Sequence, residues 1–202
     1  MKNFISSEAR IKEIVSISTN ILLHRIAVGD ILFENEASMQ LQLGVIIQNV
    51  GKLFEFSKDE HFSISLEHVE KILPTQKSPA GNARCDIWIE LTANRKTCTC
   101  AIELKYFPKQ KDETVTENRF SILKDLENIE HYESADMGYQ IVYTDNKNYT
   151  DSNTRSYINI GEGQILTGKK ESNGREVYLQ KEYPIHWEII ECQGKSHCLL
   201  IL

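Results

Sequence analysis

Asp86, Glu103 and Lys105 are the side chains whose types and spacing best fit a chemical role. They lie in two segments with strand character, 84–91 and 97–106, separated by a short polar stretch. A turn at the centre of that stretch places Asp86 directly opposite Glu103 in an antiparallel hairpin, where facing side chains lie about 4.5–5.5 Å apart at Cβ. Lys105 follows Glu103 by two positions, so it emerges on the same face. The sequence therefore brings two carboxylates and a lysine to the open end of one hairpin.

The reverse face of the same hairpin is apolar, which predicts that it packs into the core. Its residues alternate along both segments: Cys85, Ile87, Ile89 and Leu91 in the first, and Cys98, Cys100, Ile102 and Leu104 in the second. No further Cys or His follows Cys98 and Cys100 in the spacing that a zinc site requires. We therefore interpret them as packed thiols rather than zinc ligands. For the polar face, the alternative interpretation is a solvated hairpin edge that carries an ordinary Glu–Lys pair.

Two carboxylates that face each other repel, so the predicted hairpin needs a compensating positive charge. A divalent cation such as Mg²⁺ fits, because it prefers oxygen ligands and commonly binds one or two carboxylates, water and substrate phosphate. A cation held there generates hydroxide from water and polarises a phosphodiester for attack. Lys105 then either assists the attacking water or stabilises the developing negative charge. These residues point to metal-dependent phosphodiester hydrolysis.

The order of Asp86, then Glu103-Leu104-Lys105 on the following strand, resembles the PD-(D/E)xK nuclease superfamily, which has the restriction-endonuclease-like fold. In that family the aspartate and the glutamate bind the metal and the lysine serves the attacking water. The resemblance implies these roles for Asp86, Glu103 and Lys105. Cys85 stands where the family's name-giving proline would be, a departure that many members share. The resemblance covers roughly residues 30–145.

Two further features of the family have candidates on predicted helices. Many members carry an acidic residue on a helix before the sheet. Glu36 is the candidate for this additional catalytic and metal-binding carboxylate, with Glu34 as a second choice. Gln40 lies one turn after Glu36 on the same helix face. Asn128 and Tyr132 are four residues apart on a later helix, similar to a Gln-x-x-x-Tyr motif of some subfamilies, with asparagine in place of glutamine.

The resemblance implies a Mg²⁺-dependent endonuclease that hydrolyses DNA, with Mn²⁺ able to substitute for Mg²⁺. A restriction-type or other defence enzyme is the first expectation, and a repair or junction-resolving nuclease is the second. Because cutting both strands with one site per chain requires a two-fold dimer, a homodimer is expected. Basic residues that flank the site are candidates for phosphate contacts that position DNA: Lys77, Arg84, Lys109, Lys111 and Arg119. The alternative is a non-catalytic nucleic-acid-binding or protein-interaction module on the same fold.

The elements that must position these residues follow from hydrophobic periodicity and from breaker residues. Helices are predicted over 8–23, 35–54 and 115–133, and a loop over 74–82. Strands are predicted over 61–66, 84–91, 97–106 and 138–144, with further strand segments at 177–179, 185–190 and 197–202. This order predicts a single α/β domain over residues 1–202, in which helices flank a mixed central β-sheet that contains the antiparallel catalytic hairpin.

Composition restricts the class of protein further. The 202 residues carry a formal net charge of −6, so bulk positive charge does not hold this protein on nucleic acid. No apolar run approaches the ~18–20 residues that cross a bilayer, and the N-terminal residues lack the apolar core of a signal peptide. We therefore expect a cytoplasmic protein without membrane contact. Five cysteines without a Cys-x-x-Cys pair favour free thiols in a reducing compartment.

Overall fold

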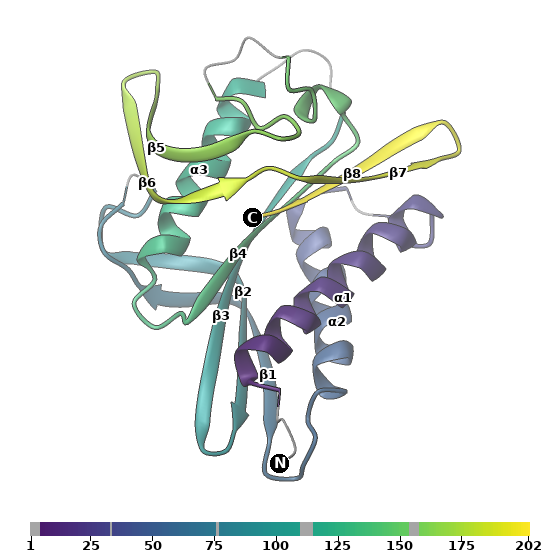
Figure 1. The fold of residues 1–202 in the computed structure, drawn as a ribbon, viewed down its shortest axis with the longest axis vertical. Coiled ribbons are helices and arrows are strands. Elements are labelled where there is room, and N and C mark those ends of the chain that lie inside the picture. Colours follow the sequence, from purple (N-terminus) through teal and green to yellow (C-terminus); the bar gives the residue numbers. More distant parts are fainter. Residues whose placement is uncertain (1–4, 33, 76, 110–114, 154–157) are drawn as a thin grey trace.

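The computed structural model describes residues 5–32, 34–75, 77–109, 115–153 and 158–202. Its centre is a six-stranded sheet in the order β1-β2-β3-β4-β8-β7 (Figure 1). Of the neighbouring pairs in this sheet, β3 and β4 run parallel and the others run antiparallel. The strands are β1 (His61–Lys71), β2 (Asn82–Ala93), β3 (Lys96–Phe107), β4 (Met137–Thr144), β7 (Trp187–Cys192) and β8 (Lys195–Ile201). The expected mixed α/β architecture is confirmed.

Helices cover both faces of this sheet (Figure 1). On one face, α1 (Ser7–Ala27) and α2 (Glu36–Lys52) share a core cluster with β2, β3, β4 and β8. On the other, α3 (Val115–His131) packs together with the hairpin of β5 (Ile165–Ser172) and β6 (Arg175–Pro184). Within the described part of the chain, no helix is both long and apolar enough to span a membrane.

Local side-chain hydrogen bonds fix the start of the first two helices. Ser6 Oγ accepts from the Ala9 N–H at 3.1 Å and caps α1. Asn35 Oδ1 accepts from the Ser38 N–H at 2.8 Å, while Ser38 Oγ accepts from the Asn35 N–H at 3.2 Å. This reciprocal capping box makes Glu36 the first residue of α2, and Glu36 lies beside Lys105 of β3.

The β2–β3 hairpin has the register that its turn predicts. Asn94 and Arg95 have φ values of 53° and 64°. This pair of left-handed residues is typical of two-residue hairpin loops, because its twist matches that of the strands. The ladder runs from Ala93 opposite Lys96 to Ile87 opposite Ile102. The next step in the same register sets Asp86 opposite Glu103, as predicted.

Cys85 does not lie on the face that strand alternation predicts. It is buried in a cluster with Trp88, Ala101 and Tyr132, on the α3 side of the sheet, whereas Ile87 belongs to the core beneath α1 and α2. The assignment of Cys85 to the same apolar face as Ile87 is therefore wrong.

An irregular step in the pairing with β1 explains this reversal. The β1–β2 ladder omits the pair of Glu67 and Asp86, and Glu67 has a φ of 55°. The ladder keeps the same register on both sides of this step, and the left-handed backbone of Glu67 marks the point where Cys85 and Ile87 come to face opposite sides. Neither described ladder of β2 includes Asp86. Its side chain and its carbonyl are therefore left to other partners.

Several strands differ from the sequence predictions in extent, most clearly β1 and also β6, which covers Arg175–Pro184 where only 177–179 is predicted, and one strand is not predicted at all. β1 continues to Lys71, well past the predicted end at residue 66, because its pairing with β2 resumes at His68 and runs to Lys71. The sequence predicts no strand where β5 lies. The only buried residues of β5 are Leu166 and Ser172, which is too little apolar alternation to identify a strand from the sequence.

Candidate active site

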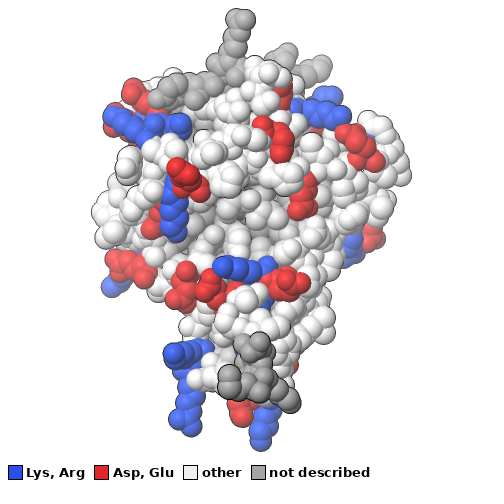
Figure 2. All heavy atoms as spheres, in the orientation of Figure 1, with Lys and Arg blue, Asp and Glu red and all other residues white. Residues whose placement is uncertain are grey.

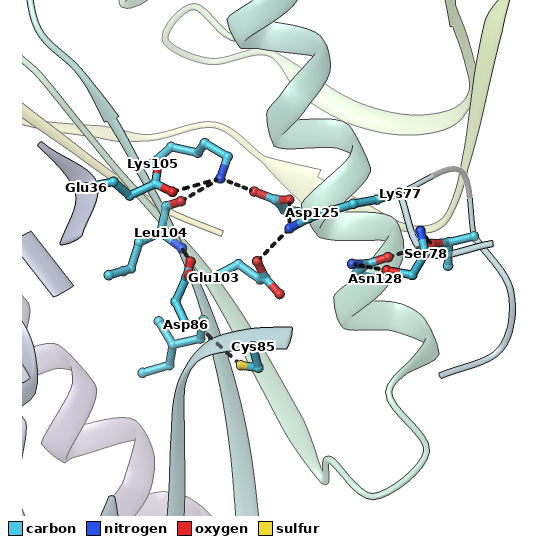
Figure 3. Close-up of polar contacts among 12 residues, drawn as sticks. Glu36, Lys77, Ser78, Cys85, Asp86, Glu103, Leu104, Lys105, Asp125 and Asn128 are labelled. Atoms are coloured by element: carbon cyan, nitrogen blue, oxygen red, sulfur yellow. Dashed lines mark hydrogen bonds and ion pairs between the residues drawn. The ribbon is translucent and has the colours of Figure 1, made fainter. Parts of the chain in front are cut away.

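Asp86 lies where β2 and β3 separate, and Figure 3 shows its side chain beside Leu104 of β3. Its Oδ2 accepts a hydrogen bond from the Leu104 N–H at 2.7 Å, so the carboxylate takes the place of a strand partner for β3. Its carbonyl accepts from Gln40 Nε2 of α2 at 2.6 Å, and the same amide donates to Glu67 Oε1 at 3.0 Å. Gln40 therefore holds the backbone of Asp86 in place.

Two lysines and three carboxylates form a continuous chain of ion pairs next to Asp86 (Figure 3). Lys105 Nζ lies 3.5 Å from Glu36 Oε1 and 2.8 Å from Asp125 Oδ2. Lys77 Nζ lies 2.5 Å from the other oxygen, Asp125 Oδ1, and 2.9 Å from Glu103 Oε2. Asp125, from α3, therefore joins the two lysines. The structure gathers the four predicted catalytic residues into one cluster and adds Lys77 and Asp125 to it.

This cluster is largely withdrawn from solvent. The side chains of Glu103 and Asp125 are each 1% exposed, and that of Lys105 is 14% exposed. Tyr132, just after α3, donates its hydroxyl to Glu103 Oε1. Glu36 lies at the rim, with 42% of its side chain exposed. The alternative interpretation of a solvated hairpin edge is therefore wrong.

Burial and crowding shift the pKa values of both hairpin carboxyls upward. Burial raises the pKa of Glu103 to about 7, and the charge of Asp125 adds to this shift, while Lys77 opposes it. Burial raises the pKa of Asp86 to about 6, although the Leu104 N–H and the charge of Lys105 favour its ionised form. Each carboxyl therefore releases its proton near neutral pH, where a bound cation would compete with that proton.

For the two lysines, the neighbouring negative charges outweigh burial, and the charged form is the favoured one. Burial by itself lowers the pKa of Lys77, but the charges of Asp125 and Glu103 together raise it above its ordinary value. The same balance raises the pKa of Lys105, through Asp125 and Glu36. Both side chains are therefore ammonium groups at neutral pH.

Sequence reasoning did not identify Asp125. It lies on the buried side of α3, three residues before Asn128 and seven before Tyr132, and this spacing sets all three on one helix face. A polar stripe on a helix that also carries an apolar stripe was the available signal.

The loop before β2 is anchored to this same helix face. Thr75 Oγ1 donates to Asn128 Oδ1 at 2.5 Å, and Asn128 Nδ2 donates to Ser78 Oγ at 3.2 Å. The Ser78 N–H donates back to Thr75 Oγ1 at 3.0 Å. Asn128 is fully buried. These bonds hold the segment on either side of Lys77 against α3, and they direct Lys77 into the cluster.

The basic residues predicted to contact nucleic acid differ in how exposed they are to solvent. Arg84 and Lys109 are exposed, and Arg84 lies 3.6 Å from Glu67. Arg119 is 2% exposed and donates to the Asn148 carbonyl at 2.9 Å, which argues against a phosphate contact. Lys111 lies outside the described residues.

The surface charge is mixed where it is visible. On the face in Figure 2, Lys and Arg side chains lie beside Asp and Glu side chains, without a broad basic area among the described residues of that face. This mixture agrees with the net charge of −6. Attraction of a phosphate backbone would therefore have to be local.

Protein-family models, curated proteins and solved structures show no match to this chain. What the site can bind follows from its donor set, which comprises the carboxylates of Glu36, Asp86, Glu103 and Asp125 against the ammonium groups of Lys77 and Lys105. With all six groups ionised, the carboxylates exceed the ammonium groups by two charges.

A second observation beside Glu103 bears on the same question. Gln140 is the β4 partner of Glu103 in the parallel ladder, and its side chain is fully buried. Neither its Nε2 nor its Oε1 has a hydrogen-bond partner among the described residues. Buried amides without partners are rare and call for an explanation such as a bound water or ion. The carboxylates of the cluster are oxygen donors of the kind that a hard, hydrated cation prefers.

The described residues do not form a finished metal centre. Among them, no three Asp, Glu, His or Cys side chains are gathered closely enough to hold a metal ion as they stand. Glu36 approaches Lys105 instead of joining Asp86 and Glu103 in a group of three carboxylates. Cys100 is fully buried in the core and Cys98 packs against it, as the interpretation of packed thiols predicts.

Proposed function

We propose that this protein is a Mg²⁺-dependent endonuclease that hydrolyses phosphodiester bonds of DNA, of a restriction or other defence type, with Mn²⁺ as a substitute cation. The observation that carries the proposal is the meeting of Asp86, Glu103 and Lys105 at the open end of a buried hairpin. The excess of two negative charges that the cluster carries when all of its groups are ionised supports it. The alternative is a non-catalytic binding module on the same fold, and the experiment below distinguishes it from a nuclease.

Asp86 and Glu103 would hold the cation, with Glu36 at the rim as a further carboxylate. When bound, Mg²⁺ would supply Lewis-acid activation of water and phosphate. Lys105 is a charged ammonium group, so its role is to orient water and to stabilise the charge that develops on the phosphate. It does not act as a neutral base. Tyr132 and Leu104 N–H orient the two hairpin carboxylates.

The test is cleavage of supercoiled and linear DNA in Mg²⁺, with sequencing of the ends. We expect wild-type protein to cut and to stop cutting when the cation is chelated. Lys105→Ala should lose about 10²–10³ in rate while it still binds DNA in Ca²⁺. Lys105→Arg keeps the charge without the compact geometry, so we expect partial activity.

The matched control is Lys147→Met, which removes a lysine from an exposed ion pair with Glu191 outside the cluster. It should cut like wild type. DNA binding without cleavage under all conditions would instead establish the non-catalytic module. Light scattering on the same samples tests the expected homodimer.

A further inference from the structure

Lys77 occupies carboxylate oxygens that a cation would need. Its Nζ lies 2.9 Å from Glu103 Oε2 and 2.5 Å from Asp125 Oδ1. Tyr132 takes the other oxygen of Glu103, so both oxygens of this carboxylate already have partners within the protein. A cation that binds Glu103 must therefore compete with an internal ammonium group.

The two lysines of the cluster are not equivalent. Lys105 pairs with Asp125 and Glu36 and donates to the Leu104 carbonyl, whereas Lys77 pairs with Glu103 itself. The side chain of Lys77 is 33% exposed and that of Lys105 is 14% exposed. Lys77 is therefore the more exposed of the two lysines, and Lys105 is the more enclosed.

The position of Lys77 is built into the fold. The buried side chain of Asn128 accepts a hydrogen bond from Thr75 and donates one to Ser78, and these bonds fasten the loop on both sides of Lys77 to α3. Only the flexible side chain of Lys77 needs to move for Glu103 to become free, since its four-carbon stem carries rotatable bonds. The loop can stay anchored while the ammonium group exchanges with another cation.

We propose that Lys77 is the resident counter-ion of Glu103 and Asp125, and that a divalent cation binds this site by displacing its ammonium group. This inference rests on the proposed function, because it takes Glu103 as a ligand of the cation. It goes beyond that function in assigning an internal competitor that sets how tightly the site takes its metal.

The direct test is calorimetric titration of Mn²⁺ into the protein without DNA. Lys77→Met removes the ammonium group and keeps a flexible apolar chain, so the site gains one unit of negative charge. We expect Lys77→Met to bind Mn²⁺ about tenfold more tightly than wild type, equivalent to about 1.4 kcal/mol. Lys77→Arg retains the positive charge and should bind no more tightly than wild type. Lys147→Met is the matched control and should be unchanged.

Equal or weaker binding by Lys77→Met, or no Mn²⁺ binding by any variant, would overturn the proposal. If wild type binds and cuts DNA while Lys77→Met gains no affinity, this inference fails and the proposed nuclease stands. If Lys77→Met gains affinity but no DNA is cut, the counter-ion role stands and the nuclease fails.

A second pair of variants guards against misfolding, since removing one partner of a buried ion pair is strongly destabilising. Lys77→Met combined with Asp125→Asn removes one charge of each sign, and Asp125→Asn alone is its reference. The double variant should bind Mn²⁺ more tightly than Asp125→Asn and gain a larger rise in unfolding temperature from Mn²⁺. Equal affinity of the two would overturn the proposal.

Discussion

On one face of β3, Cys100, Ile102 and Leu104 are fully buried beneath α1 and α2; on the other, Glu103 and Lys105 are almost as buried against α3. The first face gains stability because apolar surface leaves water, by about 1.5–3 kcal/mol for each large side chain. The second face takes charges out of water, which is unfavourable unless each charge is paired.

The two faces differ in how far the contribution of one residue to stability depends on its neighbours. An apolar residue on the first face contributes to stability almost independently of distant charges. On the second face, Glu103, Asp125, Lys77 and Lys105 stabilise the protein only as a set, because each compensates its neighbours. A buried ionic set is weak support for stability.

The largest expected effect on stability comes from removing the central carboxylate of the charged face. Asp125→Ala leaves Lys77 and Lys105 without their shared partner, and we expect it to lower the free energy of unfolding by about 3–5 kcal/mol. Urea denaturation measures this. A loss below about 1 kcal/mol would mean that these ion pairs behave like exposed ones.

A deletion on the apolar face should be nearly as costly but insensitive to charge. Ile102→Ala creates a cavity beneath the helices and should lower the free energy of unfolding by about 2–5 kcal/mol. The same loss is expected at pH 5 and pH 8, and with or without Mn²⁺. A loss that changes with pH or cation would break the contrast between the two faces.

The charged face should make stability depend on pH. The folded-state pKa of Glu103 is raised to about 7, so between about pH 4 and pH 7 the folded protein binds more protons than the unfolded chain. Stability then falls as pH rises through this window, by about 1–3 kcal/mol without divalent cations. Asp86, with a pKa of about 6, acts in the same direction.

Denaturation at several pH values in chelator, with Glu103→Gln as reference, isolates this contribution. The variant keeps the size of the side chain and removes its titration, so its stability should fall less from pH 5 to pH 7 than that of wild type. Parallel pH profiles for the two proteins would contradict the raised pKa of Glu103.

The smallest expected effect concerns Gln140, the buried polar side chain beside Glu103. Gln140→Leu replaces an amide without partners among the described residues by an apolar group, and we expect stability to rise by about 1 kcal/mol. Mn²⁺ affinity should fall in the same variant if the amide supports a hydrated cation. A destabilised Gln140→Leu would mean that the amide is already well satisfied in the folded protein.

The sequence alone determined the hairpin and the polar residues that lie on it. Strict alternation defined the apolar face at Ile87, Ile89 and Ile102, and the turn at Asn94 and Arg95 fixed the register. These are short-range properties, since side-chain alternation and turn geometry involve residues close together in the chain. For the same reason, residue types and spacing are sufficient to single out Asp86, Glu103 and Lys105.

Only the tertiary structure decided what surrounds those three residues. Lys77 and Asp125 meet across 48 positions of sequence, because α3 packs on the sheet at the point where the loop before β2 arrives. The reversal of Cys85 likewise depends on an irregular step in the pairing with β1. Periodicity in one segment cannot specify which distant element covers it, since that choice belongs to the packing of whole layers around the core.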